Sequence, residues 1–318
     1  MRKWRTTSAV LLALLGAVVI VGCGSSSSSS SSSSAGSSSS AGSSSSAGAR
    51  STPSSSGANS KVAALVPAAI KSKGTLTVAA DASYAPNEFI ASDGHTVIGM
   101  DADLMKALAS QMGLKIKIVN ATFDSIIPGL AAGKYDVGAS SFTDTKAREK
   151  TVDFVDYFVA GESFYTKSTG GTSLTGLSGL CGHTVAVERG TTEQSDATAQ
   201  SGKCKSAGKP AVTVLSFADQ NGANLALSSG RAQLGFADSP VAAYQVKKSN
   251  GQFKLVGSSI ENAPYGLAVP KTSGLSKPIL AALQVLIQNG SYKTILTHWG
   301  IQAGAIPPAK VKVNGATS

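Results

Sequence analysis

The sequence contains few residues of the kinds that build metal and redox centres. Its 318 residues include only three cysteines, three histidines and two tryptophans. His95, His183 and His298 are isolated, and no cysteine pair has the close spacing of a zinc site. The composition therefore argues against a metal site, and we expect no cofactor.

Charged residues are also scarce, and they form no long run. Asp, Glu, Lys and Arg make up 14% of the chain, and the formal net charge is +10. The basic residues are scattered and are not interleaved with aromatic residues, so we expect no nucleic-acid partner. The sequence also lacks a nucleophile elbow and a phosphate-binding glycine loop, which argues against common catalytic sites.

No apolar run is long enough to span a bilayer. After a basic start, Ala9–Gly22 is a run of 14 apolar or small residues, whereas a spanning helix needs about 20. This pattern predicts a secretory signal peptide over residues 1–22. Ile20–Cys23 resembles the bacterial lipobox, which implies that Cys23 becomes the lipid-modified first residue of the mature chain. An ordinary signal with an incidental cysteine is the alternative.

The next segment has little but serine, alanine and glycine. Residues 24–60 contain no residues able to build a core, so we expect a disordered linker with an end-to-end distance of about 30–37 Å. Residues 61–73 are predicted to be a helical lead-in, and residues 303–318 a loose tail.

Two cysteines remain beyond Cys23. In an exported chain, Cys181 and Cys204 predict a disulfide that closes a loop of about 24 residues and contributes roughly 3 kcal/mol. Two free buried thiols are the alternative.

Between residues 74 and 302 the pattern alternates between strands and helices. Three strands and two helices follow one another in fewer than 70 residues after Gly74, which predicts a parallel sheet covered on both faces. A second unit repeats this plan, with strands over 184–188, 212–217 and 233–238. Residues 256–270 are predicted to return as extended chain, and one long helix from about Pro278 would close the domain at Trp299.

The stretch Gly138–Arg148 has the composition of an anion site. A strand end, several hydroxyl side chains and a helix start capped by Thr143 or Asp144 would converge near Arg148. This arrangement suits a carboxylate or a phosphate; a capped helix with a solvated arginine is the alternative. Asp101 and Asp103 at another helix start fit the helix dipole better than a cation site.

Four motifs resemble one known family, the extracellular solute-binding proteins, family 3, which are receptors of polar amino-acid ABC importers. The resemblance covers roughly residues 74–302 and rests on Asp81–Pro86, Gly99–Leu104, Phe123–Leu130, and Ser140–Thr143 with Arg148. It implies an α/β, type II periplasmic-binding-protein fold of two lobes, each a sheet covered by helices, joined by two hinge strands near 159–163 and 263–266. Lobe 1 would comprise 74–159 and 266–302, and lobe 2 would comprise 160–265.

The same resemblance implies which residues bind the ligand. Arg148 would bind the α-carboxylate, Ser141 and Thr143 would support it, and Asp238 would receive the α-ammonium. Tyr84 and Phe123 would be the aromatic pair that sandwiches the ligand's side chain, and Asp81 and Glu188 would lie near the tip of that side chain. Hydroxyl or backbone donors would come from Ser140, Thr191 and Thr192. Glu88 would be a further acid, from the loop after the first strand.

The acidic residues suggest a specificity. Asp81, Glu88 and Glu188 would place surplus negative charge at the cleft, which favours a cationic side chain such as that of arginine, lysine or ornithine over a neutral ligand such as glutamine. Two alternatives remain: Glu88 could face solvent, and Arg189 could neutralise Glu188.

The resemblance implies a lipid-anchored, monomeric receptor on the outer face of the bacterial cytoplasmic membrane. It would bind a free amino acid and deliver it to an ABC permease and, through the permease, to an ATPase. One alternative is a cyclohexadienyl-dehydratase-like enzyme using Glu188 or Glu193 as acid or base. Another is a ligand-sensing ectodomain, against which the lack of a transmembrane helix argues.

Overall fold

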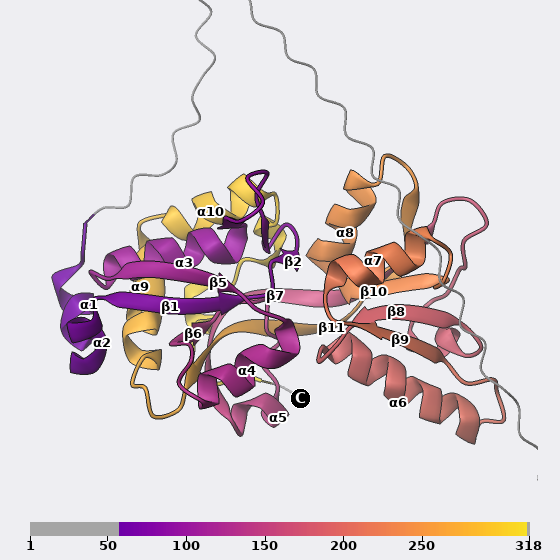
Figure 1. Cartoon of the computed structure of the whole chain (residues 1–318), viewed down its shortest axis with the longest axis horizontal. Helices are drawn as coiled ribbons and strands as arrows, with labels where there is room; N and C mark the ends of the chain where they lie inside the picture. The colour runs from indigo at the N-terminus through magenta and orange to yellow at the C-terminus, as the bar shows by residue number, and fades with distance from the viewer. Residues whose placement is uncertain (1–56, 317–318) are drawn as a thin grey trace, which may run out of the picture. The chain divides into compact units, whose positions relative to one another are not determined.

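A computed structural model of the chain describes residues 57–316, which form an α/β body in two parts (Figure 1). The predicted signal peptide, Cys23 and most of the predicted linker lie outside these residues. We call the part that contains both ends of the described chain lobe 1. Its elements are α1 Ser60–Leu65, α2 Ala68–Lys73, β1 Thr75–Ala80, β2 Ser83–Tyr84, β3 Glu88–Ile90, β4 Val97–Ile98, α3 Met100–Gln111, β5 Lys115–Asn120, α4 Phe123–Ala131, β6 Val137–Gly138, α5 Lys146–Glu149, α9 Ser276–Gln288, α10 Ser291–Trp299 and the 3₁₀ turns η2 Gln302–Gly304 and η3 Pro308–Lys310.

The second part, lobe 2, is a continuous stretch of chain with the same alternation of strands and helices. It lies beside lobe 1, and two long strands run between them (Figure 1). Its elements are η1 Leu177–Leu180, β8 Thr184–Glu188, α6 Thr192–Ser206, β9 Thr213–Phe217, α7 Gln220–Ser228, β10 Leu234–Asp238 and α8 Ser239–Lys248.

The two long strands, β7 Val152–Lys167 and β11 Phe253–Pro270, join both lobes into one sheet. The strand order is β5-β1-β6-β11-β7-β10-β8-β9, and a small sheet of β2, β3 and β4 lies beside it. Strands β1, β5 and β6 pair in parallel, as do β8, β9 and β10, whereas β7 and β11 are antiparallel to each other. The register of β7 and β11 shifts between Val256 and Ala263 and again after Tyr265, where the strands pass from one lobe to the other.

The burial of β1 explains why lobe 1 has two hydrophobic layers. Leu76 and Val78 pack in one cluster with Leu104 of α3 and Leu283 of α9. Ala79, on the opposite face of the strand, packs in a second cluster that contains residues of α4. Side chains of a strand alternate between faces, so the sheet is covered on both sides. The parallel sheet predicted for this unit is therefore confirmed.

Lobe 2 has its own core and the predicted disulfide. Val185, Val187 and Leu234 pack there on one face of the sheet, while the small alanines of α7 pack on the other. Cys181 and Cys204 are bonded and connect the segment after η1 to α6. The alternative of two free thiols is wrong.

Two expectations about the ends of the domain are corrected. Asn59 accepts hydrogen bonds from the backbone of Lys61 and Val62, so helix α1 starts at Ser60, which the sequence analysis assigned to the linker. The expected single helix after Pro278 is two helices, α9 and α10, separated at Gly290, which has a φ of 81°. Within residues 57–316 no helix is both long enough and apolar enough to cross a membrane.

The C-terminal segment is not loose. Ile306 and Val311 are buried, and Val313 forms a β-bridge with Val155 of β7. Asn314 accepts a hydrogen bond of 2.8 Å from the amide of Phe154. The segment therefore packs along β7, which sequence periodicity does not predict.

Candidate functional site

A narrow cavity lies between the two lobes, and its volume of about 10 Å³ leaves room for about one water molecule. The cavity is lined by residues of both lobes, Asp81, Tyr84, Phe123, Ser140, Ser141, Thr143 and Arg148 from lobe 1, and Glu188, Thr191, Thr192, Glu193 and Asp238 from lobe 2. These are all the predicted ligand-binding residues except Glu88, together with Glu193, which was predicted only as a catalytic residue of the alternative enzyme.

The topology of the sheet explains why these residues meet. Asp81 follows the carboxyl end of β1, Ser140 follows β6, and Glu188 and Asp238 are the last residues of β8 and β10. Ligands of open α/β sheets bind outside the carboxyl ends of parallel strands. Because the two parallel units face each other across β7 and β11, both sets of strand ends point to one cavity.

Arg148 contacts both lobes. Its Nη1 donates to the carbonyl of Thr143 at 2.8 Å, and its Nη2 donates to the carbonyl of Gly190, in lobe 2, at 2.9 Å. The guanidinium also lies 5.3 Å from the ring centre of Phe123 and 5.6 Å from that of Phe142. Burial lowers the pKa of this group, but arginine stays charged at neutral pH.

The cap of the helix that carries Arg148 differs from the prediction. Thr145 is the N-cap, because its Oγ1 accepts a hydrogen bond from the Arg148 amide, and neither Thr143 nor Asp144 has this role. Helix α5 has only four residues, Lys146–Glu149, so it contributes little of the dipole expected at an anion site. The positive charge comes from the guanidinium itself.

Asp81 is the acid of lobe 1 in this cavity. It is 4% exposed, and its two oxygens accept hydrogen bonds from Ser83 Oγ at 2.6 Å and from the Phe123 amide at 3.0 Å. Burial raises the pKa of Asp81, although both hydrogen bonds oppose the rise. The carboxylate is thus fixed in orientation at the cavity wall.

Glu188 and Glu193 bring two further carboxyl groups from lobe 2. Oε1 of each is buried and has no hydrogen-bond partner among residues 57–316. Burial raises the pKa of both groups well above the usual range, and the neighbouring charges of Asp81 and Asp238, respectively, raise them further. Such a cluster of acids would be stabilised by a cation placed among them.

Asp238 is linked directly to lobe 1 through Tyr84. The Tyr84 hydroxyl donates to Asp238 Oδ2 at 3.0 Å and accepts a hydrogen bond of 3.0 Å from the Asp238 amide. Burial raises the pKa of Asp238 to about 7, against the opposing effect of that hydroxyl. Tyr84 therefore holds the acid in place as well as lining the cavity.

Two threonines line the cavity at the start of α6. Thr191 is the N-cap of this helix, and its hydroxyl donates to the carbonyl of Glu188 at 2.9 Å. The hydroxyl of Thr192 lies 3.4 Å from that of Thr143, across the boundary between the lobes. Thr191 thus has an occupied hydroxyl, and Thr192 forms part of the contact between the lobes.

The model of the bacterial extracellular solute-binding proteins, family 3, matches residues 76–302. The chain belongs to this family. It is 38% identical over 252 residues to the arginine-binding protein ArgT of Corynebacterium glutamicum, covering 79% of this chain and 82% of that protein.

Solved structures agree with this assignment. An ancestral arginine-binding protein bound to arginine is 36% identical, with a TM-score of 0.65, and the match covers 71% of this chain and 98% of that one. An ancestral amino acid-binding protein, a precursor of cyclohexadienyl dehydratase, is 32% identical with a TM-score of 0.65, covering 73% of this chain and 97% of that one. The two-lobed fold expected from the sequence is confirmed.

Glu88 is the predicted site residue of this family 3 protein that does not line the cavity. It is 0% exposed in β3, and its carboxyl oxygens accept hydrogen bonds of 3.2 Å from the hydroxyls of Ser140 and Ser141. Asp101 accepts a hydrogen bond from the Ser141 amide at 2.9 Å. Glu88 therefore lies behind the cavity wall, and neither the hydroxyl nor the amide of Ser141 is free to donate to a ligand.

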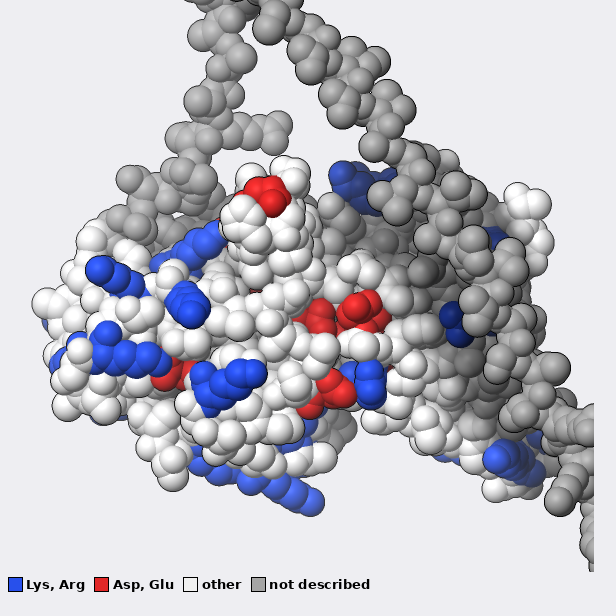
Figure 2. All heavy atoms as spheres, in the orientation of Figure 1, with Lys and Arg blue, Asp and Glu red and all other residues white. Residues whose placement is uncertain are grey.

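Arg189 does not neutralise Glu188. Its Nε forms an ion pair of 3.2 Å with Asp124 of lobe 1, and both side chains are partly exposed. In the orientation of Figure 2, several acidic side chains lie near the junction of the two lobes with a basic side chain beside them, while Lys and Arg are spread over both lobes. The ion pair connects the lobes outside the cavity and does not involve Glu188.

The aspartates at the start of α3 have structural roles. Asp101 accepts hydrogen bonds from Tyr157 and Ser141, and Asp103 accepts them from Lys106 and Trp299. Among residues 57–316 there is no group of His, Cys, Asp and Glu side chains that could hold a metal ion.

Proposed function

We propose that this protein is a receptor that binds a basic amino acid, with arginine as the preferred ligand, in the cavity between the lobes. The observation that carries the proposal is the distribution of charge: Arg148 is the only basic side chain lining the cavity within the described residues, and it faces four acidic ones. The names of the relatives given above support arginine in particular.

The α-carboxylate of the ligand would bind to Arg148. A planar guanidinium can donate two parallel hydrogen bonds to a carboxylate, and it is the most suitable side chain for this contact. Its present acceptors are backbone carbonyls of Thr143 and Gly190, so it is already oriented at the boundary between the lobes.

The α-ammonium group would bind to Asp238. An ammonium buried between two lobes needs a charged acceptor, because the desolvation of an unpaired ion costs several kcal/mol. Asp238 has one oxygen hydrogen-bonded to Tyr84, and Glu193 places a second carboxyl group nearby. Since Arg148 and Asp238 belong to different lobes, a zwitterion can pair with both only when the lobes are closed, which links binding to closure.

The cationic side chain would extend toward Asp81 and Glu188. Asp81 is held at the wall by Ser83 and Phe123, and Glu188 has a buried oxygen without a partner in the described chain. A guanidinium offers five N–H donors to such acceptors. A neutral ligand such as glutamine would leave the two acids without a compensating charge.

The export and transport steps of the proposal rest on the sequence and the family. Residues 1–22 would direct export, Cys23 would carry the lipid, and the serine-rich segment that precedes α1 would tether the receptor to the outer face of the cytoplasmic membrane. The monomeric receptor would then deliver its ligand to an ABC permease that is coupled to an ATPase.

The test is a binding screen with the purified protein, unfolded and refolded to remove bound ligand. Thermal unfolding would be recorded with each common amino acid. At 100 times the Kd a ligand adds about 2.7 kcal/mol of stability, so arginine should produce a clear shift. Tight binding of glutamate without any binding of arginine would overturn the proposed specificity. No shift with any amino acid, together with turnover of a prephenate-like substrate, would favour the enzyme instead.

A further inference from the structure

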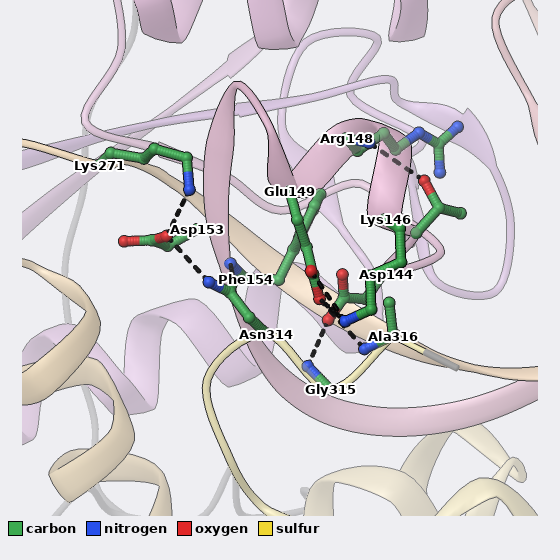
Figure 3. A network of polar contacts seen from close by, with 11 residues as sticks. Asp144, Lys146, Arg148, Glu149, Asp153, Phe154, Lys271, Asn314, Gly315 and Ala316 are labelled. Carbon is green, nitrogen blue, oxygen red and sulfur yellow. Dashed lines mark hydrogen bonds and ion pairs between the residues drawn. The ribbon is translucent and has the colours of Figure 1, made fainter. Parts of the chain in front are cut away.

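The C-terminal segment 311–316, which we call the strap, ends at the loop that carries Arg148. The amide of Gly315 donates to Asp144 Oδ2 at 2.7 Å, and the amide of Ala316 donates to Glu149 Oε1 at 3.2 Å (Figure 3). Asp144 directly follows Thr143, and Glu149 directly follows Arg148. The two amides therefore bind the carboxylates of the residues that directly follow Thr143 and Arg148, the two proposed carboxylate-binding residues.

The strap is itself firmly attached to β7. The Asp156 amide donates to the carbonyl of Lys312, and Asn314 exchanges backbone and side-chain hydrogen bonds with Phe154. Asn314 Nδ2 also donates to Asp153 at 3.0 Å, and Lys271 binds the same carboxylate oxygen (Figure 3). Asn314 has a φ of 57°, a conformation that asparagine tolerates better than most residues.

Main-chain hydrogen bonds to a second element also support the loop. The amide of Asp144 donates to the carbonyl of Pro264, and the amide of Gly266 donates to the carbonyl of Phe142. Both partners belong to β11, one of the two strands that pass between the lobes. Helix α5 is a single turn, so it cannot fix the direction of Arg148 alone.

We propose that the strap is a positioning element for the ligand's α-carboxylate, which holds Thr143 and Arg148 in the geometry that binds it. The inference rests on the proposed function, since it concerns the same site. The strap lies beyond residue 302, where the match to the family 3 model ends.

Gly315 provides a sharp test, because a side chain does not fit there. A Cβ atom at this position would lie 1.8 Å from Asp156 Oδ2 and 2.6 Å from Lys312 Cε. Gly315→Ala in the full chain should therefore displace the strap from Asp144. Gly202→Ala is the matched control, because a Cβ atom at Gly202 meets nothing within 4 Å. A chain that ends at Lys312 is a second variant, and it keeps the buried Ile306 and Val311.

The readout compares L-arginine with L-argininamide, which lacks the carboxylate charge. If the strap positions the carboxylate site, the Gly315→Ala variant and the shortened chain should each bind arginine with a Kd roughly tenfold higher than that of the wild type. Binding of argininamide should change less than about twofold, because its other contacts remain. Gly202→Ala should bind both ligands as the wild type does.

Three results would contradict the inference or its basis. An unchanged arginine affinity in both variants would overturn the positioning role. An equal loss for arginine and argininamide would show that the strap only stabilises the fold. If the wild type bound neither compound, the proposed function itself would be rejected, and the strap proposal with it.

Discussion

Arg148 connects the two lobes through one side chain. Its two terminal nitrogens donate to Thr143 in lobe 1 and to Gly190 in lobe 2, and its flat face lies over two aromatic rings. Each of these contacts depends on the planar shape of the guanidinium. An ammonium group of the same charge cannot reproduce them.

Arg148→Lys should therefore weaken arginine binding although the charge is kept. Loss of charge-assisted hydrogen bonds costs about 1.5–3 kcal/mol, which corresponds to roughly a 10- to 100-fold increase in Kd. Isothermal titration calorimetry would measure the change. Arg231→Lys is the control, because Arg231 is exposed on lobe 2 and does not line the cavity. Equal affinities of Arg148→Lys and wild type would exclude this role.

Glu88 is an acid whose surroundings favour its uncharged form. It is fully buried beside Asp101, and burial, together with the charge of Asp101, raises the pKa of Glu88 well above the usual range. Its oxygens still accept hydrogen bonds from Ser140 and Ser141.

Glu88→Gln should then be tolerated, because an amide keeps the size, the neutrality and an acceptor oxygen. The free energy of unfolding should fall by less than about 1 kcal/mol, whereas Glu88→Ala should cost about 3 kcal/mol through the lost acceptors and the cavity. Urea denaturation followed by circular dichroism would compare the two. A larger loss for Gln than for Ala would contradict the neutral state of Glu88.

The residue-level errors of the sequence analysis have a common cause. Thr143, Asp144 and Thr145 all have side chains that can cap a helix, and the sequence does not reveal that Asp144 is engaged by the distant Gly315. In the same way, Glu88 follows a strand end as a ligand-binding acid would, but pairing within the small sheet turns it inward. Long-range contacts decide both cases.

Local sequence patterns are sufficient to predict a helix or strand where the pattern reflects one buried face of that element. The alternation of residue types in β1 and the helical spacing of Leu104, Leu108 and Met112 are typical of elements with one buried face, and the structure buries these three residues in one cluster with Leu76 and Val78 of β1. The strap was not predictable in this way, because its order comes from pairing with β7 and not from any periodicity of its own. The break between α9 and α10 was missed although Gly290 marks it.

The disulfide of lobe 2 should stabilise the contact between η1 and α6 without affecting ligand binding. Cys181 and Cys204 fix the end of η1 to α6 and lie outside the cavity lining. Replacing both by serine should lower the free energy of unfolding by roughly 3 kcal/mol, and Tm by about 6–12 °C. Arginine affinity should stay within about twofold of the wild-type value. Calorimetric scans of both proteins would check the first part, and a Tm difference below about 2 °C would contradict it.

Three aspartates, Asp101, Asp156 and Asp238, are buried in the folded protein. Burial raises the pKa of Asp238 to about 7, of Asp101 to about 6 and, with help from Asp144, of Asp156 to about 8. An aspartate in the unfolded chain has a pKa near 3.9, so the folded state binds protons more tightly between these values.

The protein without ligand should therefore become more stable as the pH is lowered from 8 to about 5.5. Arginine binding should respond in the opposite direction, because it needs Asp238 ionised, and protons compete with the ligand below a pH of about 7. Thermal unfolding at several pH values, with and without arginine, would show both trends. An arginine-induced shift of Tm that stays constant from pH 8 to 5.5 would contradict the role of Asp238.

The contact of Gly190 with lobe 1 also sets a limit on the length of a ligand. Its backbone lies so close to Asp124 that an added Cβ atom would approach the Asp124 side chain to 3.0 Å, and Arg148 donates to its carbonyl. Under the proposed function, the ligand ends at Arg148 with its carboxylate. A peptide would continue past this point into the contact and would hold the lobes apart. The receptor would thus distinguish a free amino acid from a peptide that carries the same residue at its N-terminus.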